Sequence, residues 1–114
     1  MMMDTHQEGE ISVLVPTGRV GTIEIESLRR SLKRLLSAGR GQVVVDLQFV
    51  PELSWSAIGA LVEKSKEFRS NKGEIKLSGL NESLASTFRA LGAHKVVDLY
   101  DSEESALKSF KPAG

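Results

Sequence analysis

VDLQFVPELSWSAIGAL, residues 45–61, is the stretch that decides the fold. It starts inside QVVVDL, residues 42–47, an almost continuous β-branched run that is typical of a strand covered on both faces. A short loop follows, and from Ile58 to Phe68 apolar residues recur at helical spacing. A buried strand that passes through a short loop into a helix predicts an α/β domain.

The same alternation of strand and helix extends toward the N-terminus. ISVLVPTG, residues 11–18, predicts a strand that closes with a proline and a glycine. A helix is expected between Thr22, as its N-cap, and Gly39. Its apolar stripe consists of Ile25, Leu28, Leu32, Leu35 and Leu36. The preceding residues, 1–9, either form a short edge strand or are loose.

The pattern also continues toward the C-terminus. EIKLSG predicts another strand, and a helix is expected between Asn81, as its N-cap, and Gly92. HKVVDLY contains a further strand, and Asp101 with Glu104 three residues later resembles a capping box for a last helix. We therefore expect one α/β domain over residues 1–114, with a mixed, mostly parallel sheet and about four helices.

The composition excludes several classes of protein. The 15 basic and 15 acidic residues balance, which argues against a nucleic-acid binder that depends on a basic excess. The sequence has no cysteine, so disulfides and thiol chemistry are excluded. No apolar run approaches the roughly 20 residues of a membrane span, and the first residues do not resemble a signal peptide. We expect a cytoplasmic domain without direct membrane insertion.

The sequence carries no recognisable enzyme motif. Neither His6 nor His94 has a partner at metal-ligand spacing, and His94 is expected to be a surface turn residue. Glycine-rich phosphate-binding motifs are absent. We therefore predict no catalytic residue, no metal and no cofactor, and a protein that is not an enzyme.

The loop before the second helix holds the most unusual residues. A serine there, Ser54 or Ser56, can cap the helix, and a phosphoserine would be stabilised by the free amides of the helix start. The only tryptophan, Trp55, lies at this junction outside any periodic apolar stripe. It is either an interface anchor or a hydrophobic lid folded onto the domain.

The first helix has a basic face formed by Arg29, Arg30, Lys33 and Arg34. These residues fall between the apolar positions of the stripe, so they point outward. They are either solvated and paired with Glu24 and Glu26, or they form an electrostatic dock for an acidic partner.

Most of the chain resembles the STAS domain of bacterial anti-sigma factor antagonists. The resemblance lies in VVVDLQFV, a loop and SAIGAL, followed by NKGEIKLSGLNESLASTFRALGAHKVVDLYDSEESAL. It implies a non-catalytic protein that binds a switch protein kinase acting as an anti-sigma factor. In such proteins, phosphorylation of the first serine of an Asp-Ser-Ser-Gly-Leu-Gly-like motif breaks the complex, and a PP2C-type phosphatase restores it.

This sequence departs from the family motif at the switch position. Counted without a gap from Asp46, the motif's aspartate falls on Ser54, its phosphorylated serine on Trp55 and its second serine on Ser56. Ala57 replaces the glycine, while Ile58 and Gly59 match the Leu-Gly pair. Because tryptophan has no hydroxyl, the usual phosphate acceptor is missing. A one-residue shift at Pro51 would return a serine to that position, but the matches on both sides disfavour it. In the early turn GRVG, Gly21 stands where the family commonly has an acidic residue.

The resemblance implies a partner-binding site formed by Ser54, Trp55, Ser56, Ile58 and Gly59. The expected partner is an anti-sigma factor or switch protein kinase, with a PP2C-type phosphatase as a further partner. A second hypothesis moves the phosphorylation site to Ser56 or Ser54. A third makes the chain a phosphorylation-independent accessory subunit of a membrane transport complex, bound to its ATPase subunit.

Overall fold

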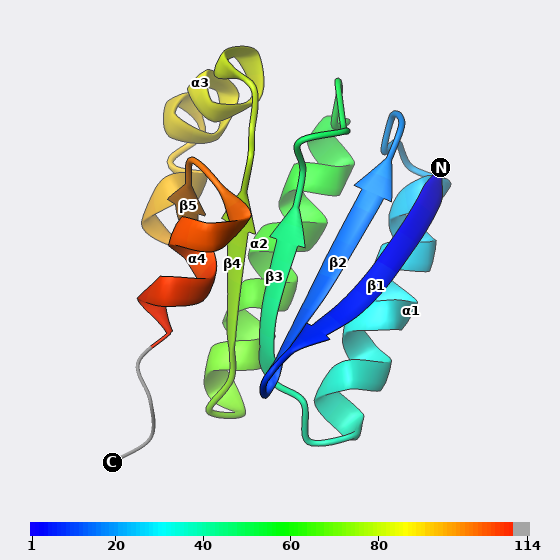
Figure 1. Cartoon of the computed structure of the whole chain (residues 1–114). Helices are drawn as coiled ribbons and strands as arrows, with labels where there is room; N and C mark the ends of the chain where they lie inside the picture. The colour runs from blue at the N-terminus through cyan, green and yellow to red at the C-terminus, as the bar shows by residue number, and fades with distance from the viewer. Residues whose placement is uncertain (111–114) are drawn as a thin grey trace.

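The computed structural model describes residues 1–110 and consists of a five-stranded sheet with helices on both faces (Figure 1). The strands are β1 Met2–Glu8, β2 Ile11–Thr17, β3 Gln42–Asp46, β4 Glu74–Ser78 and β5 Asp98–Tyr100. The helices are α1 Glu24–Ser37, α2 Trp55–Ser70, α3 Glu82–Ala90 and α4 Glu103–Ser109, with a short 3-10 helix η1 Ala93–Lys95.

The strands lie in the order in which they occur in the sequence. β1 pairs with β2 in the antiparallel direction, and the pairs β2–β3, β3–β4 and β4–β5 are parallel. The prediction of an α/β fold with a mixed, mostly parallel sheet and about four helices is therefore confirmed. The N-terminal residues form the edge strand β1.

Two apolar layers hold the helices to the sheet. On one face α1 and α2 run along the strands, and the core there contains Leu14, Val43, Val45, Leu28 and Phe68 (Figure 1). The opposite face carries Val13 and Val44, which pack against Ala106 of α4. The side chains of a strand alternate between the two faces, so neighbouring valines of β3 serve both layers.

One buried cation lies under α4. The ammonium of Lys76, in the middle of β4, donates a hydrogen bond to the Tyr100 hydroxyl at 3.2 Å. It also lies 4.7 Å from the centre of the Phe110 ring. The lysine stem and the two rings thus cover each other on the α4 face of the sheet.

Among α1, α3 and α4, the predicted cap is confirmed for one helix and wrong for two. Asn81 caps α3 by accepting the Leu84 N–H, as predicted. The prediction that Thr22 caps α1 is wrong, because α1 begins at Glu24 and, among the described residues, no side chain caps it. The capping box at Asp101 is also wrong, because the hydroxyl of Ser102 accepts the Ser105 N–H instead.

Candidate functional site

The loops after β2 and β3 run side by side at the carboxyl end of the parallel strands (Figure 1). The Val20 N–H donates to the Glu52 carbonyl, and the Ser54 N–H donates to the Val20 carbonyl, each at 3.0 Å. Val20 and Leu53 are both buried beneath this short parallel bridge. The paired loops therefore form a fixed platform at the start of α2, where ligands of open α/β sheets commonly bind.

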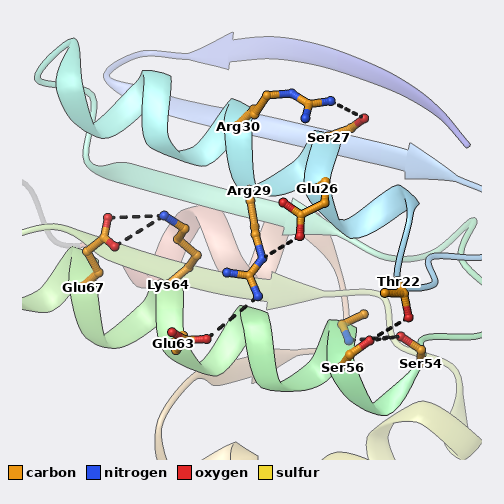
Figure 2. Close-up of polar contacts among 11 residues, drawn as sticks. Thr22, Glu26, Ser27, Arg29, Arg30, Ser54, Ser56, Glu63, Lys64 and Glu67 are labelled. Atoms are coloured by element: carbon orange, nitrogen blue, oxygen red, sulfur yellow. Dashed lines mark hydrogen bonds and ion pairs between the residues drawn. The ribbon is translucent and has the colours of Figure 1, made fainter.

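Three hydroxyl groups meet on this platform (Figure 2). The Ser54 Oγ accepts the Ala57 N–H at 3.1 Å and so caps α2, as one of the two predicted possibilities. The same Oγ lies 2.9 Å from the Ser56 Oγ, which in turn lies 3.2 Å from the Thr22 Oγ1. The Thr22 hydroxyl therefore bonds to α2, away from the helix that it precedes.

Three large apolar side chains of the paired loops and the start of α2 are exposed. Trp55 is 73% exposed, Ile23 is 82% exposed and Phe49 is 55% exposed. The lid interpretation of Trp55 is therefore wrong, because the ring is not folded onto the domain. We call Ile23, Phe49 and Trp55 the apolar corner. Exposed side chains of this size on one rim are typical of a protein–protein contact.

The two remaining predicted contact residues differ in position. Ile58 is only 3% exposed and belongs to the main core, so the expectation that its side chain contacts a partner needs correction. Gly59 lies on the surface, and a Cβ added there would meet no described atom within 4 Å. Gly59 is one helical turn from Trp55, so the helix surface beside the tryptophan is bare backbone.

The platform also has two fixed carboxylates. Glu24 Oε1 accepts the Gly21 N–H at 2.9 Å, and this hydrogen bond lowers the pKa of Glu24. Glu52 pairs with Arg19 at 3.0 Å between Oε2 and Nε. Both interactions hold the loop between β2 and α1 in place, next to the apolar corner.

The basic face of α1 is partly neutralised (Figure 2). Arg29 Nε lies 3.4 Å from Glu26, and its Nη2 lies 3.9 Å from Glu63 of α2. Arg30 donates to the Ser27 hydroxyl at 3.3 Å. The predicted pairing with Glu26 is confirmed, whereas Glu24 is engaged by the Gly21 N–H.

The histidines lie away from the corner. His6 of β1 pairs with Glu103 of α4, with 3.2 Å between Nε2 and Oε1. His94 lies in η1 and is half-buried. Within residues 1–110, His, Asp and Glu form no cluster of three or more that could hold a metal ion. In the same range, no helix combines the length and the apolar character needed to cross a membrane.

Sequence reasoning missed Thr22, Ile23 and Phe49. Ile23 precedes the apolar stripe of α1 by two residues, so it falls on the opposite side of the helix from Ile25. This two-residue offset from the apolar stripe is the feature of the sequence that indicates an exposed isoleucine. The sequence contains no comparable signal for Phe49 or for the contact between Thr22 and Ser56.

Three solved structures share this fold at low sequence identity. An anti-sigma factor antagonist from Mycobacterium paratuberculosis is 16% identical, with a TM-score of 0.85 over 95% of this chain and 92% of that chain. The unphosphorylated anti-sigma factor antagonist SpoIIAA of Bacillus is 14% identical, with a TM-score of 0.75 over 94% and 96%. The murine anion transporter Slc26a9 is 14% identical, with a TM-score of 0.71 over 90% of this chain and 18% of the transporter.

The family assignment rests on a different comparison. No curated protein sequence matches this chain significantly. The STAS domain family, in contrast, matches residues 2–106, which is nearly the whole chain and includes every strand and the paired loops. The chain therefore belongs to the STAS domain family.

Proposed function

We propose that this chain is a non-enzymatic interaction module that binds a regulatory protein through the apolar corner and the start of α2. The partner is an anti-sigma factor or switch protein kinase, a choice supported by the fold shared with anti-sigma factor antagonists. One observation carries the proposal: three exposed apolar side chains belong to a rigid, hydrogen-bonded pair of loops and the helix start beside it.

The arrangement suits a docking surface for two physical reasons. Trp55 offers a large ring and an indole N–H, a combination that is enriched among the residues dominating binding energy. Gly59 leaves the neighbouring helix surface without a side chain, so a partner can approach the backbone closely. Little of this surface needs to be ordered on binding, because the loops beneath it are already paired.

Of the two serines, Ser56 is the better candidate for phosphorylation. Its side chain is exposed in the first turn of α2, and that turn contains no acidic residue. A phosphate there would lie near free helix amides. Ser54 is already engaged as the N-cap, and phosphorylation would disturb that bond.

The second candidate is a phosphorylation-independent accessory subunit of a membrane transport complex. Trp55 favours it, because the residue at the family's switch position has no hydroxyl. STAS folds also occur within transporters such as Slc26a9 and a sulfate transporter family protein of Wolinella succinogenes. In this case the same surface would bind the ATPase subunit.

Affinity capture from the native cell, with the tagged chain as bait, tests the proposal. We expect capture of an anti-sigma factor or switch kinase, with or without a PP2C-type phosphatase, and loss of capture with Trp55→Ala. Leu91→Ala is the matched control, because Leu91 is also exposed but lies at the end of α3. Capture of a transporter ATPase selects the second candidate. Capture that survives Trp55→Ala contradicts the proposed surface.

A further inference from the structure

The outer edge of β1 is a second surface that the proposed function does not use. β1 spans seven residues and, within residues 1–110, has a neighbouring strand on one side only. Its sequence MMDTHQE contains no proline or lysine, the residues that commonly block such an edge. The opposite edge strand, β5, has only three residues. β1 is therefore the edge on which a further strand can pair.

The proline in β2 indicates which backbone groups of β1 face outward. Met3 lies opposite Pro16, and β1–β2 pairing continues past it, whereas β2–β3 pairing stops at Leu14. Pro16 has no N–H to donate. Its nitrogen therefore faces the β3 side, where pairing has already stopped and no hydrogen bond is lost. Gly18, two residues later, also directs its N–H toward that side, to the Phe49 carbonyl.

The N–H and C=O groups of successive residues in a strand point to opposite sides. The orientation of Pro16 therefore fixes the orientation of Met3 opposite it, and of every other residue of β1. The residues opposite Val13 and Val15, His6 and Asp4, exchange hydrogen bonds with β2. Met3, Thr5 and Gln7 then direct their N–H and C=O groups to the free edge. Unpaired groups on the edge of a sheet are a template for another strand.

We propose that two copies of this chain pair through β1 in the antiparallel direction, about a two-fold axis at Thr5. Thr5 then faces Thr5 of the second copy, and Met3 faces Gln7 on either side. All three outward pairs are satisfied, which gives about six intersubunit hydrogen bonds. Threonine pairs across antiparallel strands add further stabilisation.

Charge selects this register over its neighbours. With the axis at Thr5, Asp4 of each copy lies opposite His6 of the other, so the pair occurs twice. Both are non-hydrogen-bonded pairs, in which the side chains of the two strands are closest. A shift in one direction places Asp4 opposite Asp4. A shift in the other direction places His6 opposite His6 and Asp4 opposite Glu8. Of these three registers, only the one centred on Thr5 avoids like charges.

The dimer would be a continuous ten-stranded sheet with two-fold symmetry. Because the paired strands are antiparallel, the two apolar corners would lie at opposite ends of this sheet. Each copy would keep its corner free, so the dimer would present two partner sites. The inference does not depend on the proposed function, since it rests on β1 alone.

Sedimentation of the 114-residue chain tests the dimer. At about 0.5 mM, a concentration that populates even a weak complex, we expect twice the 12.4 kDa mass of one chain. Thr5→Pro removes the outward N–H without removing a β1–β2 hydrogen bond, so it should raise the dimer Kd at least about tenfold. Thr5→Ala, which keeps the N–H, is the control and should dimerise.

Cross-linking gives a second readout that does not require the proline variant to fold. The chain has no cysteine, so Thr5→Cys introduces a single thiol. Two such residues would lie about 5.5 Å apart between Cα atoms, within disulfide range. We expect rapid oxidation to a covalent dimer, and slow oxidation for the exposed control Ser37→Cys on α1. A monomeric protein at 0.5 mM, a folded Thr5→Pro variant that still dimerises, or equal oxidation of both cysteine variants would overturn the proposal.

Discussion

The hydroxyl of Ser56 in the first turn of α2 lies 3.2 Å from the hydroxyl of Thr22, which precedes α1 by two residues. This contact joins segments 34 residues apart in the sequence. Ile23 follows Thr22 and Trp55 precedes Ser56, so the same contact holds the two most exposed apolar side chains of the corner at one end of the sheet. The proposed partner surface thus depends on two loops that are fixed to each other.

The two serines of the corner should differ in their effect on stability. Ser54→Ala removes the N-cap of α2 and should lower the free energy of unfolding by about 1 kcal/mol. Ser56→Ala removes only exposed hydroxyl contacts and should change it by less than about 0.5 kcal/mol. Urea unfolding of both variants measures the difference. An equal loss for both would contradict the assignment of Ser54 as the cap.

Trp55 and Ile58 should show opposite behaviour, although they lie within one turn of α2. Trp55→Ala should leave the free energy of unfolding within about 0.5 kcal/mol of the wild type, because the ring is exposed. Ile58→Ala should lower it by about 2–5 kcal/mol, because it leaves a cavity in the core. Thermal and urea unfolding provide the test. A large loss with Trp55→Ala would mean that the ring packs onto the domain.

The carboxyl group of Glu24 should titrate below its usual pKa of 4.5, because the Gly21 N–H donates to the ionised form. A lowered pKa in the folded state means that the interaction stabilises the fold above pH 4.5 and is lost as the pH falls through the folded-state pKa. A carbon-detected NMR titration measures this directly. Titration at or above 4.5 would show that the bond to Gly21 is absent in solution.

The sheet and helices could be predicted because their signals are local. The β-branched run of β3 and the apolar stripe of α1 depend on residues a few positions apart. The capping errors have a simple physical origin. Asp101 and Ser102 are adjacent and both favour N-caps, so the sequence does not decide which residue caps the helix. The sequence pattern favours Thr22 as the cap of the nearest helix, but its hydroxyl bonds to a residue that is distant in the sequence.

The site was predicted less completely, because exposure depends on tertiary packing. The family motif assigns Ile58 to the site, although its spacing to Leu61 and Phe68 puts it on the buried face of α2. The sequence gives no sign that Phe49 is exposed, because phenylalanine is more often buried. Its exposure follows from the turn in which Val50 N–H bonds the Leu47 carbonyl, a feature that the sequence does not specify.

Substitutions of Gly59 should affect the stability of the protein and its binding to a partner in opposite directions. Glycine inside a helix is unfavourable by about 0.5–1 kcal/mol relative to alanine, and a Cβ at this position would meet no described atom within 4 Å. Gly59→Ala should therefore raise the free energy of unfolding by about that amount. A protein that keeps a destabilising glycine on an open surface is expected to use the space.

The binding half of this prediction needs a larger side chain at the same position. Gly59→Arg should leave the protein at least as stable as the wild type, because arginine is a good helix former and the site is open. It should nevertheless weaken capture of the partner at least about tenfold, because the side chain would occupy the surface beside Trp55. Ser70→Arg, at the exposed far end of the same helix, is the matched control because it adds the same single charge away from Trp55. If Gly59→Arg binds as well as the wild type while Trp55→Ala does not, the contact is restricted to the apolar corner and excludes the second turn of α2.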